Sequence, residues 1–553
     1  MPTTLNTDLF VLEPQNVLLA VVGFSLTIHL IFKRYEPPSV IIQIVLLLAI
    51  PCLLSTMLFA HMNAFKAFII TFATYYFTLC SSIVLYRLSP FHPLARYPGP
   101  IMCKVSKIWL AYVASKGKQH LYIQDLHNRY GDAVRIGPNE LSFNDANAVS
   151  AIMGSHGLPK GPNWGGRLFH NPIRSLIAIQ DPREHLIRRK PWNRAFNTGS
   201  LKELQPLLAA RVGQLVESVG KQEGVVDLSA WISFFTYDFM CDMAFGGGSE
   251  MMRDADPEGT WKKMEQGLSF ALWLDHLPWL GYYAKVVQAA ASDSFEFRTM
   301  AIKRIQERQR GGANRRDLMY FLTNEDIGGE QPVTRVLVAD GILAIVAGSD
   351  TTSSVLSNAF FLLMTHPKVY ERLQAEVDRY YPPGENALDS QHHPKMSYLD
   401  AVINETMRMC PAVMSGSQRT TMAGTGGKAI GSHFLPEGTQ ARLHFYSVQR
   451  DPRNFSDPNS FWPERWLIAG GHMAFSEKLV HNPNAFVPFS HGPANCVGKS
   501  LAMSEMRIVI CQMMQKVNMK FAPGWNPQNW ERDLEDRYVT KKGSLPVIIE
   551  KRG

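Results

Sequence analysis

One cysteine of this sequence lies where its thiol could do chemistry. Cys496 stands in the run "FSHGPANCVGK" (489–499), where turn-forming glycine and proline precede a helix-like pattern. At a helix N-terminus, the dipole and the free backbone N–H groups favour a thiolate and can donate hydrogen bonds to its sulfur. This environment suits a nucleophile or an axial metal ligand. A structural thiol and half of a disulfide also stay open on this run alone.

The spacing of the cysteines argues against two kinds of structural site. The chain has 7 cysteines, at positions 52, 80, 103, 241, 410, 496 and 511, with no CxxC pair and no close cluster. A zinc finger or a disulfide scaffold is therefore not expected, because both need closely spaced cysteines. An odd number cannot pair completely within one chain, so free thiols in a reducing compartment are the simpler expectation.

A second group of polar residues interrupts an apolar helical pattern. Residues 334–364 read "TRVLVADGILAIVAGSDTTSSVLSNAFFLLM", which predicts a helix buried through a large domain. Its centre carries Gly348, Asp350 and Thr351, and such polar side chains are costly to bury without partners. Either the threonines bond back to the preceding turn and the aspartate meets a cation, or the helix opens locally. In the second case the acid and the alcohol would deliver protons into a cavity.

Two further motifs pair a glutamate with an arginine. In "SYLDAVINETMRMCP" (397–411), Glu405 and Arg408 lie three residues apart on one face of a predicted helix. The aromatic run "FWPERW" (461–466) supplies a second pair, whose charges would be partly covered and would need partners. Each motif alone is weak, because exposed pairs of this kind are usually solvated.

The first 86 residues predict a membrane anchor. Three uncharged apolar stretches, at 16–32, 40–60 and 67–86, are each about as long as a helix that crosses a bilayer. A cleaved signal peptide would begin with basic residues, whereas this chain begins with acidic ones. If all three stretches cross the membrane, the flanking cations predict that the N-terminus lies outside. A crossing by only two of them stays open, because Pro51 interrupts the second stretch. A buried helical hairpin of a soluble protein is the alternative.

The rest of the chain is predicted to form one large domain behind a linker. Residues 87–100 include "SPFHPLARYPGP", whose prolines predict a stiff linker, and 101–553 contains no comparable linker or repeat. The net charge of +8 would suit an anionic membrane surface or an acidic partner. Because lysine and arginine are scattered among acidic residues without a basic stripe, nucleic acid is not expected as a partner.

The order of these motifs resembles that of the cytochrome P450 family of heme-thiolate monooxygenases, over essentially all of 87–553. "AGSDTT" resembles the family's oxygen-activating helix motif, "ETMR" its ExxR motif, "FWPERW" its PER motif and "FSHGPANCVG" its cysteine loop FxxGxRxCxG. "YPGP" resembles the hinge after the membrane anchor, and "EHLIRRK" the helix that binds a heme propionate. The several anchor segments and "GPANCVGK" resemble fungal members in particular.

The resemblance implies a mainly α fold with a minor β region, behind an N-terminal transmembrane anchor, that encloses heme b. It makes Cys496 the axial ligand of the heme iron and Phe489 the shield of the sulfur. Thiolate donation to the iron favours O–O cleavage. His185, Arg189 and Arg419 become partners of the heme propionates.

The resemblance also assigns roles to the remaining motif residues. Asp350 and Thr351 become the catalytic acid and alcohol that manage protons during oxygen activation. Glu405, Arg408 and Arg465 become a buried charge network that serves folding rather than catalysis.

One position departs from the family pattern. The cysteine loop of the family has arginine two residues before the cysteine, where this chain has Ala494. That arginine normally meets a propionate, so another group should take its place. His185, Arg189 and Arg419 are predicted to share the task, with His491 as an addition.

The implied reaction consumes O2 and two electrons and inserts one oxygen atom into a lipophilic small molecule. The electrons should come from NADPH through a separate flavoprotein reductase, with cytochrome b5 as a further candidate partner. The anchor and the fungal resemblance imply an endoplasmic reticulum membrane, a catalytic domain facing the cytosol, and secondary-metabolite biosynthesis with terpenoids as one candidate class. Substrate contacts are predicted in 163–179, 268–287, Ala347 and "PAVMSG" (411–416).

Two other functions remain open. A heme-thiolate isomerase or dehydratase would rearrange an oxygenated lipid without O2 or a reductase, but the motif "AGSDTT" serves proton delivery to dioxygen and argues against it. A membrane-anchored binding protein without catalysis is the second alternative. The chain has Cys496, Asp350 and Thr351 together, which argues against a loss of catalysis.

Overall fold

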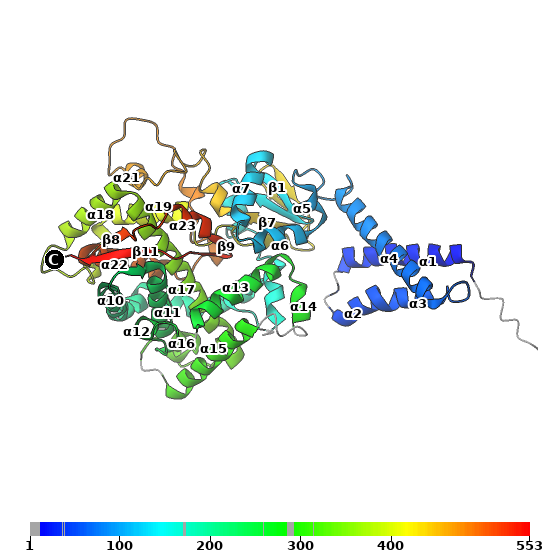
Figure 1. The fold of residues 1–553 in the computed structure, drawn as a ribbon, viewed down its shortest axis with the longest axis horizontal. Coiled ribbons are helices and arrows are strands. Elements are labelled where there is room, and N and C mark those ends of the chain that lie inside the picture. Colours follow the sequence, from blue (N-terminus) through cyan, green and yellow to red (C-terminus); the bar gives the residue numbers. More distant parts are fainter. Residues whose placement is uncertain are drawn as a thin grey trace, which may run out of the picture.

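The computed structural model describes residues 12–35, 37, 39–169, 173–257, 259–284, 292–312 and 315–552. A small bundle of N-terminal helices stands at one end of the molecule, and a larger body of helices with small sheets forms the rest (Figure 1). The prediction of a mainly α fold with a minor β region is confirmed.

The N-terminal bundle presents apolar side chains on its outside. Its elements are α1 (Pro14–Tyr35), α2 (Val40–Ile44), a π-helical stretch (Val45–Ala49), α3 (Ile50–Thr56) and α4 (Ala64–Leu88). Both α1 and α4 are long and apolar enough to cross a membrane, and Val40–Thr56 is a shorter apolar helical segment. Phe77 is 75% exposed and Leu85 70% exposed, which suits lipid surroundings better than water.

Pro51 coincides with an irregularity in the middle segment of the bundle. It stands at the start of α3, directly after the π-helical stretch, and it has no backbone N–H to continue the regular bonding. The segment 40–56 is thereby the shortest and least regular of the apolar segments. The choice between two and three spans stays a prediction.

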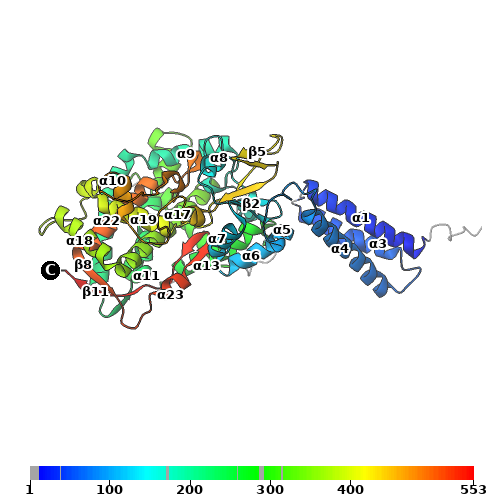
Figure 2. The same ribbon diagram turned by 90° about the horizontal axis from the view of Figure 1, so that it is seen from above.

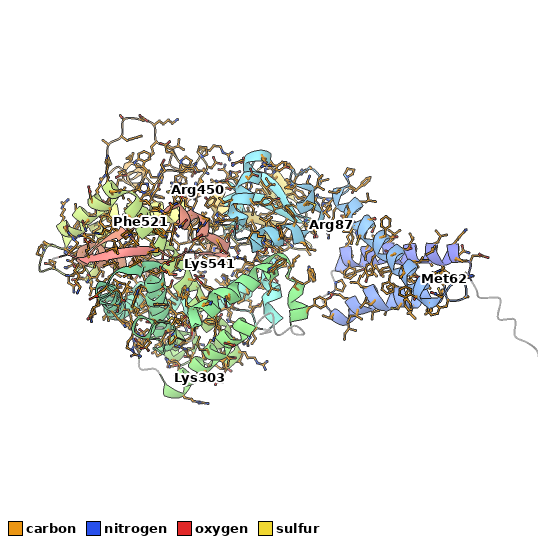
Figure 3. All side chains as sticks on the ribbon, in the orientation of Figure 1. Met62, Arg87, Lys303, Arg450, Phe521 and Lys541 are labelled. Carbon is orange, nitrogen blue, oxygen red and sulfur yellow. The ribbon has the colours of Figure 1, made fainter. Side chains whose placement is uncertain are left out.

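Residues 89–100, which the sequence predicts to be a stiff linker, pack closely onto the body. Tyr97 is buried, and its hydroxyl donates to the backbone oxygen of Phe434 at 2.9 Å. Arg87 lies where α4 meets the body (Figure 3), and its Nη1 donates to the backbone oxygen of Val105 at 2.6 Å. The segment is therefore held by specific contacts at both of its ends.

The body is built around α17 (Thr334–Thr365), which runs through its middle (Figure 2). This helix packs against α11 (Leu228–Phe245), α19 (Ser397–Met409) and α22 (Lys499–Lys516). By length and composition α17 could cross a membrane, but 61% of its apolar window is buried inside the protein. It is the central core helix that its all-round apolar pattern predicts.

The other helices surround α17 and complete the body. They are α5 (Ile101–Val105), α6 (Lys107–Ser115), α7 (Gln119–Tyr130), α8 (Ala148–Met153), α9 (Pro182–Ala195), α10 (Thr198–Gly220), α12 (Met251–Asp254), α13 (Thr260–His276), α14 (Leu280–Ala284), α15 (Ser292–Gly311), α16 (Leu318–Leu322), α18 (Pro367–Tyr380), α20 (Phe445–Val448), α21 (Glu464–Ala469) and α23 (Gln528–Asp533). Of these, α9 matters most for the site.

The strands form small sheets beside the helices. Their bounds are β1 (Ala133–Gly137), β2 (Glu140–Phe143), β3 (Val225–Asp227), β4 (Arg419–Thr420), β5 (Lys428–Ile430), β6 (His433–Leu435), β7 (Gln440–Leu443), β8 (Val517–Phe521), β9 (Glu535–Arg537), β10 (Val539–Lys541) and β11 (Pro546–Lys551). The largest sheet has the order β1-β2-β7-β4, in which β2 and β7 are parallel and the other pairs antiparallel. Its edge strand β4 carries Arg419, so this sheet positions one predicted site residue.

Candidate functional site

The cysteine loop is a tight turn that ends against a helix. The backbone N–H of Cys496 donates to the Phe489 oxygen at 2.9 Å, which closes the loop, and α22 begins three residues after the cysteine. Gly492 has φ +73°, and a Cβ atom there would lie 2.2 Å from the backbone oxygen of Met153. Only glycine fits this turn, because other residues combine left-handed strain with a clash. The Gly498 N–H donates to the Cys496 sulfur.

Cys496 offers one sulfur donor in this loop. Protein atoms crowd around the thiol, although the side chain keeps exposed surface, and this crowding raises its pKa. The Gly498 N–H and the cations Arg189 and Lys499 act in the opposite direction. Across the described ranges, no three or more His, Cys, Asp and Glu side chains gather to hold a metal ion. One thiolate is the donor that the axial position of a ring-held metal takes, and metal binding displaces the thiol proton.

Helix α9 docks onto the cysteine loop through an arginine. Asp181 caps the helix by accepting hydrogen bonds from the N–H groups of residues 183 and 184, and His185 and Arg189 follow one turn apart on one face. From Arg189, Nη1 donates to the backbone oxygen of Asn495 at 2.7 Å and Nη2 to its side-chain oxygen, also at 2.7 Å. The structure therefore brings Arg189 to the residue next to Cys496.

Four basic side chains lie together beside α9. Burial and, to a smaller extent, repulsion by Lys160, Arg189 and Arg419 together lower the pKa of His185 to about 4. Among the described residues, none of the four forms an ion pair with a carboxylate, and the buried Nε of Arg419 lacks a hydrogen-bond partner. Such a cluster fits a planar cofactor that carries two carboxylates, because buried cations need anionic partners.

Sequence reasoning predicts three members of this cluster and misses Lys160. One feature of the sequence could have indicated it: Lys160 lies in the run "GLPKGP" (157–162), which has no acidic residue to pair with it. A lysine in such a segment either reaches solvent or is covered, and here only 7% of Lys160 is exposed. His491, the predicted addition, is exposed on the cysteine loop.

Helix α17 carries the predicted acid and alcohol. The Thr351 hydroxyl donates to the backbone oxygen of Ala347 at 2.6 Å, one turn earlier. Of the two alternatives for this helix, the structure shows the first: the threonine bonds back, and α17 is continuous through this point. Gly348 serves packing instead: a Cβ atom there would lie 2.4 Å from the Met240 sulfur. Ala347 is nevertheless exposed and Thr351 half-exposed, so one face of α17 opens at this turn.

Asp350 is buried, and its charge has a nearby cation. Burial raises the pKa of the Asp350 carboxyl to about 7, although Lys542 lowers it and Glu265 raises it. Lys542 is itself buried, and its Nζ donates to the Ser353 hydroxyl at 3.0 Å. Asp350 can therefore gain and lose a proton near neutral pH. Lys542 is a second residue that sequence reasoning misses, since nothing local marks it.

The predicted glutamate–arginine network is assembled in the core. Nη2 of Arg408 lies 2.8 Å from Oε1 of Glu405, and Nε of Arg465 lies 3.0 Å from the same oxygen. All three side chains are fully buried. The Trp466 indole N–H donates to the other carboxylate oxygen at 3.0 Å. This full set of partners makes it a structural network, as predicted, rather than a reactive one.

A cavity of 410 Å³ lies beside the cysteine loop. It is lined by Asp400, Asn404, Phe486, Val487, Pro488, Phe489, Ser490, Lys499, Ser500, Met503 and Arg507. The Lys499 ammonium lies 5.8 Å from the centre of the Phe489 ring. Phe489, the predicted shield of the sulfur, therefore lines this cavity together with Lys499.

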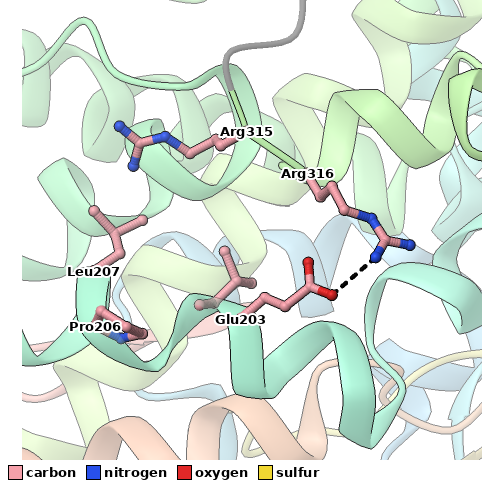
Figure 4. Close-up of a pocket in the computed structure, with 6 residues that line it drawn as sticks. Glu203, Pro206, Leu207, Arg315 and Arg316 are labelled. Atoms are coloured by element: carbon pink, nitrogen blue, oxygen red, sulfur yellow. Dashed lines mark hydrogen bonds and ion pairs between the residues drawn. The ribbon is translucent and has the colours of Figure 1, made fainter.

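A second cavity lies away from these residues. It has a volume of 540 Å³ and is bounded by Glu203 and its neighbours on α10 and by Arg315 and Arg316 (Figure 4). Arg316 pairs with Glu203 at 2.8 Å, with both side chains about half exposed. None of the predicted site residues lines this cavity, so it is not part of the candidate site.

The predicted substrate segments are described only in part. Residues 170–172 and 285–287 of these segments lie outside the described residues. Within the described part, Trp164 packs edge to face on Tyr538, with ring centres 5.1 Å apart. Burial lowers the pKa of Arg419 and Tyr538 acts in the opposite direction, so this aromatic pair adjoins the basic cluster.

In one helical body, a cysteine loop offers a single thiolate, Arg189 of the basic cluster contacts this loop, and α17 carries an acid and an alcohol. These groups suit an oxidoreductase that works through a bound metal cofactor. The chain belongs to the cytochrome P450 family, whose model matches residues 96–544. It is a monooxygenase of this family, and family members carry a heme whose iron is bound by a thiolate.

Curated fungal proteins resemble this chain over most of its length. Cytochrome P450 monooxygenase FCK2 of Fusarium pseudograminearum is 34% identical over 86% of this chain and 85% of its own length. Cytochrome P450 67 of Uromyces fabae is 32% identical over 94% of this chain and 96% of its own. Tryprostatin B 6-hydroxylase of Aspergillus fumigatus is 27% identical over 89% and 86%.

Proposed function

We propose that this protein uses a heme iron bound by Cys496 to insert one oxygen atom of O2 into a lipophilic secondary metabolite. The observation that carries the proposal is the contact between α9 and the cysteine loop. Through the two hydrogen bonds from Arg189 to Asn495, it fixes a cationic helix beside the candidate iron ligand. A thiolate and flanking cations are what a heme with two carboxylates needs.

Each group of residues has its own task in this proposal. The bound heme supplies oxygen activation and transfer. Cys496 binds the iron, Phe489 covers the sulfur, and His185, Arg189 and Arg419 bind the propionates. Asp350 holds a proton near neutral pH because burial raises its pKa to about 7, and the Thr351 hydroxyl, half-exposed on the same helix, passes protons onward.

The electrons come from NADPH through a separate flavoprotein reductase on the same membrane. The cavity beside the cysteine loop supports this partner, because Lys499, which lines it, would attract an acidic docking surface. Cytochrome b5 would use the same surface. The apolar outside of the N-terminal bundle supports a membrane location, which we take to be the endoplasmic reticulum with the body in the cytosol.

The relatives support a substrate from secondary metabolism. Among them are a tryprostatin B 6-hydroxylase and a trichothecene C-15 hydroxylase, both fungal and each similar over more than four fifths of this chain. We propose hydroxylation of a substrate of comparable lipophilicity, with terpenoids as one candidate class.

The test is oxygen incorporation by the full-length protein in vesicles that also contain an NADPH-dependent reductase. Vesicles are incubated with lipophilic fungal extracts under 18O2, and products are compared by mass spectrometry with and without NADPH. The proposal predicts a product that gains one 18O atom only when NADPH and reductase are present, and loss of that product with Cys496→Ala. A product of unchanged oxygen content that forms without NADPH would instead identify an isomerase or dehydratase.

A further inference from the structure

The cysteine loop lacks the cation that the family pattern puts two residues before the cysteine. Ala494 stands there, in the short helical turn Gly492–Ala494, and its methyl group cannot meet a carboxylate. Arg189 donates three of its five N–H groups to Asn193 and Asn495, which leaves two for a carboxylate. A further cation from another element would therefore help to replace the missing charge.

Lys160 lies buried among the cations that are expected to bind the propionates. Only 7% of it is exposed, and its Nζ donates to the backbone oxygen of Leu176 at 2.9 Å. Burial and, to a smaller extent, repulsion by Arg419 and Arg189 together lower the pKa of its ammonium to about 7. A second, negative partner would therefore favour the charged form of Lys160 strongly.

The backbone around Lys160 is fixed to the strand that carries Arg419. Lys160 and Arg419 form a bridge between antiparallel segments. The Thr420 N–H donates to the Pro159 oxygen at 3.0 Å, and the Gly161 N–H to the Gln418 oxygen at 2.8 Å. A Cβ atom at Gly161 would lie 2.5 Å from the Gln418 side chain, so glycine is needed for this close approach. Lys160 is thus held beside Arg419 before any ligand binds.

Donors in this cluster lack acceptors within the described part of the chain. The buried Nε of Arg419 has no hydrogen-bond partner there, and its Nη1 reaches only the Leu158 oxygen at 3.4 Å. His185 faces the same cations and no carboxylate that shifts its pKa. Buried cations of this kind are costly unless a ligand brings negative charge.

We propose that Lys160 replaces the arginine missing at Ala494 and, together with Arg419, binds a propionate of the heme. This inference rests on the proposed heme binding. In the family pattern, an arginine of the cysteine loop binds this propionate. Here the segment just before the short helical turn Pro162–Phe169 would bind it instead. The ligand chemistry is a carboxylate on a planar metal cofactor.

The test compares heme retention in three variants of the full-length holoprotein. Lys160→Met removes the charge, Lys160→Arg keeps it, and Lys428→Met is the matched control, because Lys428 donates to a backbone oxygen of the same segment, at His156, from an exposed position. Heme loss to an excess of a heme-binding acceptor protein is followed by absorbance. Lys160→Met should lose heme roughly tenfold faster, since one charge-assisted contact is removed, whereas Lys160→Arg and Lys428→Met should resemble the wild type.

Two further readouts distinguish a heme contact from a purely structural role. The reduction potential of the heme should fall in Lys160→Met, because a nearby positive charge favours the reduced iron. The heme-free form of Lys160→Met should melt no lower than the heme-free wild type, because the variant removes an unpaired buried cation. Equal heme loss and equal potential in Lys160→Met and Lys428→Met would overturn the inference. A wild type that binds no heme would instead overturn the proposed function.

Discussion

At the scale of single residues, the body holds two kinds of buried charge. Glu405 is surrounded by Arg408, Arg465 and an indole N–H, so every charge has a partner. Lys160 and Arg419 have no carboxylate partner among the described residues. A fully paired set serves folding, whereas a same-sign set suits a charged ligand. This difference in pairing distinguishes the structural network around Glu405 from the basic cluster that would bind the cofactor.

We expect Glu405→Ala to destabilise the protein strongly. It leaves Arg408 and Arg465 buried without a carboxylate, and breaking a buried pair costs about 3–5 kcal/mol. The thermal midpoint and the soluble yield of the full-length protein should both fall. Glu217→Ala is the control, because it removes only the exposed pair with Lys221 and should change neither measure. Equal behaviour of the two variants would contradict the structural role of the network.

Asp350 should make the stability of the protein depend on pH. Its folded pKa of about 7 lies above the ordinary aspartate value of 3.8, so the unfolded chain releases this proton at lower pH than the folded protein does. The carboxyl therefore costs stability progressively as pH rises from about 4 to about 7. We expect Asp350→Asn to melt higher than the wild type at pH 8, with a smaller difference at pH 5. A difference that does not change with pH would contradict the raised pKa.

Gly492→Ala should weaken the cysteine loop without touching the cysteine. The alanine would carry the left-handed φ of +73° and would meet the Met153 oxygen at 2.2 Å. The left-handed conformation alone costs about 1–2 kcal/mol for a residue with a Cβ atom. We expect lower heme content per purified protein, measured by absorbance, while Gly312→Ala, which has φ +70° in open space, retains heme.

At the scale of elements, α9 connects the cysteine loop to α17, although the three lie in separate parts of the chain. Arg188 on α9 pairs with Asp340 on α17 at 2.5 Å, and Arg189, the next residue, contacts the cysteine loop. The pair Arg188–Asp340 is mostly buried, so it links the two helices firmly. These helices and the loop are therefore positioned together rather than independently.

The N-terminal bundle should hold the full-length chain in a membrane. Its outward apolar side chains, such as Phe65 at 73% exposure, have no counterpart to cover them in the described chain. We expect the full-length protein to stay with membranes after an alkaline carbonate wash. A variant that begins at Arg87 keeps the contact to Val105 and should be released much more readily. Release of the full-length protein by the same wash would contradict a spanning anchor.

At the scale of the whole molecule, local patterns predict the elements well. The apolar run 334–364 predicts α17, which spans Thr334–Thr365, and "SYLDAVINETMRM" predicts α19. The apolar stretches predict the helices of the bundle. These elements follow from hydrophobic periodicity and caps, which depend on neighbours in sequence.

Contacts between distant segments could not be predicted in the same way. Lys160 meets Arg419 across more than two hundred positions of sequence, and Lys542 reaches the central turn of α17 from the C-terminal region. Neither lysine lies in a local pattern that distinguishes it from a surface cation. The choice between a continuous and a locally opened α17 also depended on such contacts: Met240, on α11, lies against Gly348, and the Thr351 hydroxyl bonds back without breaking the helix.

The most direct test of the central claim is a carbon monoxide difference spectrum of the reduced full-length protein in microsomes. Cys496→Ala is measured beside the wild type, and Cys410→Ala, at a half-buried cysteine of the body, is the matched control. The account predicts the red-shifted Soret band of thiolate-bound heme in the wild type and in Cys410→Ala, and its loss in Cys496→Ala. Absence of the band from the wild type, or its persistence in Cys496→Ala, would contradict the assignment of Cys496 as the iron ligand.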